Sequence, residues 1–190
     1  MSIDTPSARD RILLTAHHLF YRFGIRATGI DRIIQEAGVT KVTFYRHFPS
    51  KDALIMAFLD YRHQHWLAAL RQSMHASISA GISPAMALSV FLKHWLSDLS
   101  FRGCAFINTT VEMAETLPET LSISQKHKQD VVDCLAQYLP ATAQGRMQAE
   151  MLVMLMDGAI VKAQRDQHSE PALALFDLMA HRLFAGDVGD

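Results

Sequence analysis

A cluster of hydroxyl, cationic and aromatic side chains occupies residues 40–51 of this chain, between apolar flanks. Thr43, Tyr45 and His47 can each donate a hydrogen bond to a phosphate oxygen, and Lys51 adds a positive charge nearby. Contacts of this kind fix the position of a protein on a nucleic-acid backbone but carry no information about base sequence. The cluster therefore predicts phosphate binding.

The residues just before this cluster have the types that read base edges. Lys41 can donate to the oxygen and nitrogen acceptors of guanine, and Val42 can pack on a thymine methyl group. Thr40 precedes them and can cap a helix with its hydroxyl. Arg46 is a further cation of the same stretch, and its role stays open. The competing interpretation is a solvated helix face whose charges bind nothing specific.

Two short helices must position these side chains. A helix over 28–37 is indicated by the capping pattern Thr28-x-x-Asp31, and a shorter one runs from Thr40 to the vicinity of Phe48. The Ala37-Gly38-Val39 stretch forms a tight turn between them, which gives the dimensions of a helix-turn-helix. In that motif the second helix enters the DNA major groove. We expect Thr28, at the start of the first helix, to hold a phosphate with its hydroxyl and the free backbone N–H groups.

The rest of the chain also has a helical pattern. Ser7-x-x-Asp10 opens a helix that Gly24 ends. Further helices are predicted over 51–78, from Ser83-Pro84 onward, and over 103–115, 119–138, 143–166 and 171–185. No strand-like alternation extends beyond a few residues. The predicted fold class is all-α.

Residues 7–60 resemble the DNA-binding domain of the tetracycline-repressor (TetR) family of bacterial transcription regulators. The resemblance lies in ILLTAHHLFYRFGIRATGIDRIIQEAGVTKVTFYRHFPSKDAL, residues 12–54, and its most specific part is TFYRHFPSKDAL. It implies a three-helix DNA-binding domain over residues 1–50 and a larger helical ligand-binding and dimerisation domain over 51–190. It also implies a homodimer on a palindromic operator in double-stranded DNA, with base contacts from Lys41 and Val42. The implied phosphate contacts come from Thr28, Thr40, Thr43, Tyr45, His47 and Lys51.

The C-terminal two thirds offer a candidate pocket for a small apolar or amphipathic effector. Pockets for such ligands combine apolar and aromatic walls with a few polar groups. Cys104, Asn108 and Glu112 are spaced four apart and so share one helical face. The alternative is that these side chains belong to the core or to interhelical hydrogen bonds. The candidate ligand residues are Trp66, Phe91, His94, Trp95, Cys104, Asn108 and Glu112.

A dimer interface is predicted near the C-terminus. Residues 150–161 are apolar nearly all round, and Gly158 in their midst permits a close helix approach. Pairing of this helix and the next with their symmetry mates makes a four-helix interface, which the resemblance also implies. The alternative is that both helices only close the monomer core. The candidate interface residues are Met151, Leu155, Gly158, Leu175, Leu178 and Met179.

Composition and charge limit the other function classes. The chain has 190 residues and a net charge of −1, and residues 1–60 are mildly basic with eight Lys and Arg against six Asp and Glu. It lacks a membrane-spanning run, a secretion signal, a metal-ligand pattern and a recognisable catalytic pairing, so we expect a cytoplasmic protein without metal, cofactor or enzymatic activity. Cys104 and Cys134 are expected to be buried thiols, and a redox role is the unsupported alternative. We predict a sequence-specific transcriptional regulator, a repressor released from its operator by a small molecule. An architectural or partner-controlled DNA binder without an inducer is the alternative.

Overall fold

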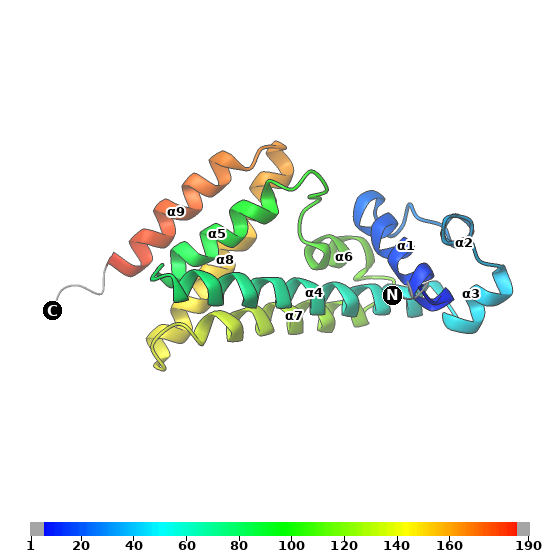
Figure 1. The fold of residues 1–190 in the computed structure, drawn as a ribbon, viewed down its shortest axis with the longest axis horizontal. Helices are drawn as coiled ribbons and strands as arrows, with labels where there is room; N and C mark the ends of the chain where they lie inside the picture. The colour runs from blue at the N-terminus through cyan, green and yellow to red at the C-terminus, as the bar shows by residue number, and fades with distance from the viewer. Residues whose placement is uncertain (1–5, 186–190) are drawn as a thin grey trace, which may run out of the picture. The chain divides into compact units, whose positions relative to one another are not determined.

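The computed structural model describes residues 6–185, and within that range every regular element is an α-helix (Figure 1). This confirms the all-α prediction. The helices are α1 (Ala8–Phe23), α2 (Ile30–Ala37), α3 (Lys41–His47), α4 (Lys51–Ser79), α5 (Pro84–Leu96), α6 (Ala105–Met113), α7 (Glu119–Ala136), α8 (Ala143–Asp166) and α9 (Glu170–Ala185).

The described residues divide into two compact units. Unit 1 contains residues 6–64 together with 105–123, and unit 2 contains residues 65–104 together with 124–185. The sequence placed a boundary at residue 50, before α4. In the structure α4 is continuous, its first half belongs to unit 1, and α6 joins unit 1 from a distant part of the sequence.

The core of unit 1 holds the helix-turn-helix together. Figure 1 shows α1, α2 and α3 gathered around one another, and these three helices contact each other pairwise. Phe44 of α3 is completely buried, and Phe48, which follows the helix, is nearly so. Ile33 of α2 and Phe20 of α1 are buried as well, so a small apolar core holds α3 in place.

Capping residues set most helix boundaries of unit 1 where the sequence placed them. The Asp10 N–H donates to the Ser7 hydroxyl over 3.2 Å, the Thr43 N–H donates to the Thr40 hydroxyl over 3.1 Å, and the Ala53 N–H donates to Ser50 over 3.0 Å. The start of α2 differs from the prediction: its N-cap is Gly29, which has no side chain to cap it.

Unit 2 is built mainly from α5, α8 and α9, which pack on one another (Figure 1). The Thr142 hydroxyl accepts from the Gly145 N–H over 3.1 Å and caps α8, as a threonine in that position should. Ser89 of α5 donates to Asp177 of α9, which ties these two helices together through polar groups. Cys104 and Cys134 are both buried free thiols, as expected.

Candidate nucleic-acid interface and ligand site

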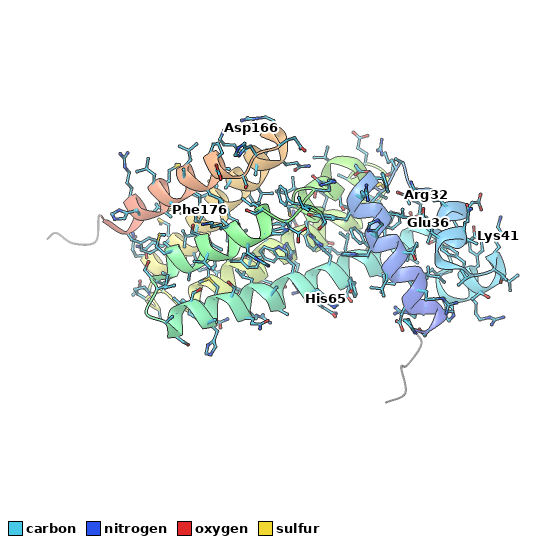
Figure 2. All side chains as sticks on the ribbon, turned by 45° about the horizontal axis from the view of Figure 1, so that its top comes forward. Arg32, Glu36, Lys41, His65, Asp166 and Phe176 are labelled. Atoms are coloured by element: carbon cyan, nitrogen blue, oxygen red, sulfur yellow. The ribbon has the colours of Figure 1, made fainter. Side chains whose placement is uncertain are left out.

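Helix α3 presents most of its predicted contact residues to solvent. Thr40, Lys41, Tyr45 and Arg46 are exposed, and Val42 is 70% exposed although it is apolar. Thr43 and His47 are half-buried at the edge of the same surface. Figure 2 shows Lys41 on this helix, with Arg32 and Glu36 on the neighbouring α2. An exposed valine on a short helix gains nothing from folding, so its position suits contact with an apolar group of a partner such as a thymine methyl.

The turn between α2 and α3 is fixed by backbone geometry and by one arginine. Gly38 has a φ of 62°, in the left-handed region, and the N–H groups of Gly38 and Val39 donate to carbonyls of the last turn of α2. Arg11 of α1 donates from Nε to the Ala37 carbonyl over 3.3 Å. This arginine holds the turn against α1, and the sequence analysis missed it because nothing in the spacing of α1 marks it.

Two of the predicted phosphate contacts have partners inside unit 1. Thr28 is completely buried, and its hydroxyl donates to the Gly24 carbonyl over 2.7 Å, so the hydroxyl is not presented to solvent. The prediction that Thr28 caps α2 was wrong because its side chain closes the end of α1 instead. Lys51 is half-buried, and its ammonium donates to the Ile25 carbonyl over 2.6 Å.

The predicted ligand residues separate into two groups. Trp66, Phe91 and Trp95 form an aromatic cluster in unit 2, with ring centroids 5.2 Å apart for Trp66 and Phe91 and 5.3 Å apart for Trp66 and Trp95. His127, which the sequence analysis did not select, lies 5.3 Å from the Trp66 ring centroid, and Phe101 lies 5.6 Å from that of Trp95. Trp66 is 9% exposed, yet its Nε1–H is buried without a hydrogen-bond partner among the residues that the structure describes.

The other predicted ligand residues lie elsewhere. His94 is exposed at the end of α5, because the apolar face of that helix turns away from it. Asn108 and Glu112 are on α6 in unit 1, and Cys104 is a buried residue of unit 2. Glu112 accepts hydrogen bonds from the backbone N–H groups of Ile25 and Arg26, so this side chain binds another part of unit 1.

An exposed apolar surface covers one side of α8 and α9. We call it the α8–α9 surface, and its large exposed side chains are Met147, Met151, Met154, Val161, Leu175, Leu178 and Met179. Met154 is 76% exposed, and Gly158 is exposed beside it with open space where a Cβ would stand. A groove of about 370 Å³ lies on this surface and is lined by Met151, Met154, Leu155, Met179, Arg182 and Leu183.

Within residues 6–185, no cluster of three or more His, Cys, Asp or Glu side chains is placed to hold a metal ion. In the same range, no helix combines the length and the apolar character that crossing a bilayer demands.

Comparison with known proteins identifies the family. Residues 12–58 match the family model described as bacterial regulatory proteins, tetR family. The fold also matches a crystal structure of a TetR-family transcriptional regulator from Streptomyces coelicolor, with a TM-score of 0.80, 31% sequence identity and coverage of 96% of both chains. The chain belongs to the TetR family. It is therefore a DNA-binding transcriptional regulator.

Two curated TetR-family relatives match well beyond the helix-turn-helix. The HTH-type transcriptional regulator TtgR of Pseudomonas putida is 28% identical over 133 residues, which is 69% of this chain and 62% of TtgR. The HTH-type transcriptional repressor NemR of Escherichia coli is 25% identical over 187 residues, 91% of this chain and 90% of NemR. For the first curated relatives the matched length is less than two thirds of the relative, and in one from Bacillus subtilis it is 18%.

Proposed function

We propose that this protein is a homodimeric cytoplasmic repressor that binds a palindromic operator and leaves it when a small molecule binds unit 2. The observation that carries the proposal is the exposed reading surface of α3 within a TetR-family helix-turn-helix. The description of NemR as a repressor supports repression as the outcome.

On the DNA, residues of α3 divide into two kinds of contact. Lys41 and Val42 read base edges in the major groove, because both are exposed and can reach a guanine edge and a thymine methyl. Thr40, Thr43, Tyr45 and His47 hold phosphates, and Arg46 adds charge at the rim. Lys51 contributes positive potential, since its ammonium already donates to the Ile25 carbonyl. Thr28 acts by closing the α1–α2 corner, through its hydrogen bond to Gly24.

The α8–α9 surface is the dimer interface in this proposal. Monomeric proteins seldom expose a contiguous apolar surface as rich as this one, and a symmetric pair of such surfaces forms a four-helix contact. The exposed Gly158 lets the backbones of two α8 helices approach closely. A C2 dimer then presents two α3 helices to half-sites about 34–36 Å apart, as a palindromic operator requires.

The aromatic cluster of unit 2 is the effector site. Within residues 6–185 the buried Trp66 Nε1–H has no hydrogen-bond partner, and leaving such a donor unpaired costs about 1–3 kcal/mol. An effector that accepts a hydrogen bond from this group and stacks on the surrounding rings removes that cost. The ligand class is therefore an aromatic or amphipathic compound that carries a carbonyl, ether or phenolic oxygen.

The test is selection of bound duplexes from a random library at near-physiological salt, followed by three variants on the selected operator. We expect a palindrome with half-sites about one helical turn apart. Lys41→Ala should relax the preference at particular base pairs, whereas Tyr45→Phe should weaken binding to all duplexes equally. Thr28→Val should weaken binding without changing the selected sequence.

Binding with less than about tenfold preference between random and selected duplexes would contradict the proposal, because specific binders discriminate by about 10³ or more. That result would favour the alternative, an architectural regulator without a small-molecule inducer. If an operator is selected but no candidate effector releases the protein from it, that result would instead favour control by a protein partner.

A further inference from the structure

A carboxylate from α6 closes the corner between α1 and α2. Oε2 of Glu112 accepts hydrogen bonds from the Ile25 N–H over 2.8 Å and from the Arg26 N–H over 3.0 Å. These two donors follow the end of α1 and precede α2, so helical hydrogen bonds do not use them. Two consecutive backbone N–H groups that face one anionic oxygen form a small anion-binding concavity. In this protein the anion is supplied by the chain itself, from 87 residues further along the sequence.

The same peptide segment is held from its carbonyl side by a cation. Lys51, the first residue of α4, donates to the Ile25 carbonyl over 2.6 Å, while the Ile25 N–H donates to Glu112. Burial lowers the pKa of Lys51, and the negative charge of Glu112 opposes that shift. The Ile25 residue therefore lies between an acid and a base that come from two other helices of unit 1.

Gly24 gives the carboxylate its room. Its φ of 88° is a conformation that a side chain disfavours, and a Cβ at this position would stand 3.0 Å from Oε1 of Glu112. The Gly24 carbonyl also accepts from the buried Thr28 hydroxyl. The corner is thus shaped around Glu112 on one side and closed by Thr28 on the other.

We propose that Glu112 is a positioning residue for operator binding, which holds the α1–α2 corner, and with it α2 and α3, in the arrangement that reads DNA. This inference rests on the proposed operator binding and adds the residue that ties the helix-turn-helix to α6. Loss of the carboxylate takes the acceptor away from two N–H groups and leaves Asp52 as the acid that opposes the effect of burial on the pKa of Lys51.

The expected effect follows from the fraction of molecules that hold the corner in place. Apparent affinity falls in proportion to the binding-competent fraction, so a drop of that fraction to about one tenth weakens operator binding about tenfold. The number of phosphate contacts does not change, and the slope of affinity against salt should therefore stay the same. A loss of phosphate contacts would instead make that slope shallower.

The experiment measures the affinity of the full-length protein for the selected operator by fluorescence anisotropy over a range of salt concentrations. The variants are Glu112→Ala, which removes both hydrogen bonds, and Glu112→Gln, which keeps an acceptor oxygen but no charge. Glu115→Ala is the matched control, because it removes the same charge from an exposed side chain three residues away. Amide hydrogen exchange at Ile25 and Arg26 and thermal unfolding of each variant are recorded in parallel.

We expect the wild type and Glu115→Ala to bind alike, Glu112→Gln to bind a few-fold more weakly, and Glu112→Ala about tenfold more weakly with an unchanged salt slope. The rate of amide exchange at Ile25 and Arg26 should rise in the same order. The melting temperatures should stay high enough that global unfolding explains none of the loss of operator affinity. Equal affinity of Glu112→Ala and Glu115→Ala overturns the inference while the proposed function stands. A wild type without preference for any duplex overturns the proposed function and this inference with it.

Discussion

Truncation of Phe44 distinguishes the contribution of α3 to stability from the DNA contacts proposed for its surface. Phe44 is completely buried, and its ring lies 5.2 Å from that of Tyr45 and 6.4 Å from that of Phe48, measured between centroids. A buried phenylalanine replaced by alanine costs about 3–5 kcal/mol, which is a large share of the roughly 5–15 kcal/mol that stabilises a typical domain. The matched control on the same helix is Val42→Ala, because Val42 is 70% exposed and its truncation should change stability by less than about 0.5 kcal/mol.

The assay is urea denaturation of the full-length protein, followed by far-ultraviolet circular dichroism. With a denaturant slope of about 2 kcal/mol/M, Phe44→Ala should lower the midpoint of the transition that contains unit 1 by about 1.5–2.5 M. Phe44→Ala should also weaken binding to every duplex, whereas Val42→Ala should lose preference only where a thymine methyl is read. A midpoint for Phe44→Ala equal to that of Val42→Ala would refute the claim that this ring anchors the reading helix.

Three further predictions follow from other parts of the structure. Leu178→Glu should convert the proposed dimer to a monomer in analytical ultracentrifugation and reduce operator affinity, while Leu99→Glu, at a position 97% exposed outside the α8–α9 surface, should do neither. Trp66→Phe removes the unpaired indole N–H and keeps a ring, so calorimetry should show about tenfold weaker binding of an oxygen-bearing effector without a matching loss of stability. Burial raises the pKa of the Cys134 thiol, so the unfolded chain ionises first and stability should fall as pH rises above the ordinary thiol pKa of about 8.5. The stability of a Cys134→Ala variant should fall less than that of the wild type in this pH range. An equal fall in both proteins would count against Cys134 as the cause.

The sequence predicted the parts of the fold that depend on local signals. Ser7, Thr40 and Ser50 each have a hydroxyl followed by a helical pattern, and each accepts the expected backbone N–H. The second capping pattern failed at Thr28, because a threonine four residues after a helix end can donate back to that end instead. Local spacing does not distinguish these two hydrogen bonds, which depend on where the α1 carbonyls lie.

The candidate sites were predictable only in part, for a similar reason. Exposure of Lys41 and Val42 follows from the period of a short helix anchored by Phe44. The aromatic cluster was anticipated through Trp66, Phe91 and Trp95, but His127 enters from a helix distant in sequence, and no local pattern marks it. The helical spacing of Glu112 and Asn108 allows either a ligand contact or a hydrogen bond to another part of the fold, and in the structure Glu112 binds backbone N–H groups 86 and 87 residues away. Spacing identifies a shared face but not what lies opposite.

Unit 1 is built from two separate segments of the sequence, and this limits where chimeras that exchange DNA specificity between regulators of this family can be joined. A chimera joined at residue 50 separates the helix-turn-helix from Leu54, Ile55 and Phe58, which are buried in unit 1. It also places the α1–α2 corner opposite whichever residue the other regulator has at the position of Glu112. A chimera that transfers the DNA-binding unit intact therefore takes two sequence segments, residues 6–64 and 105–123. If only the first segment is transferred, the receiving protein has to carry an acidic residue at the position of Glu112.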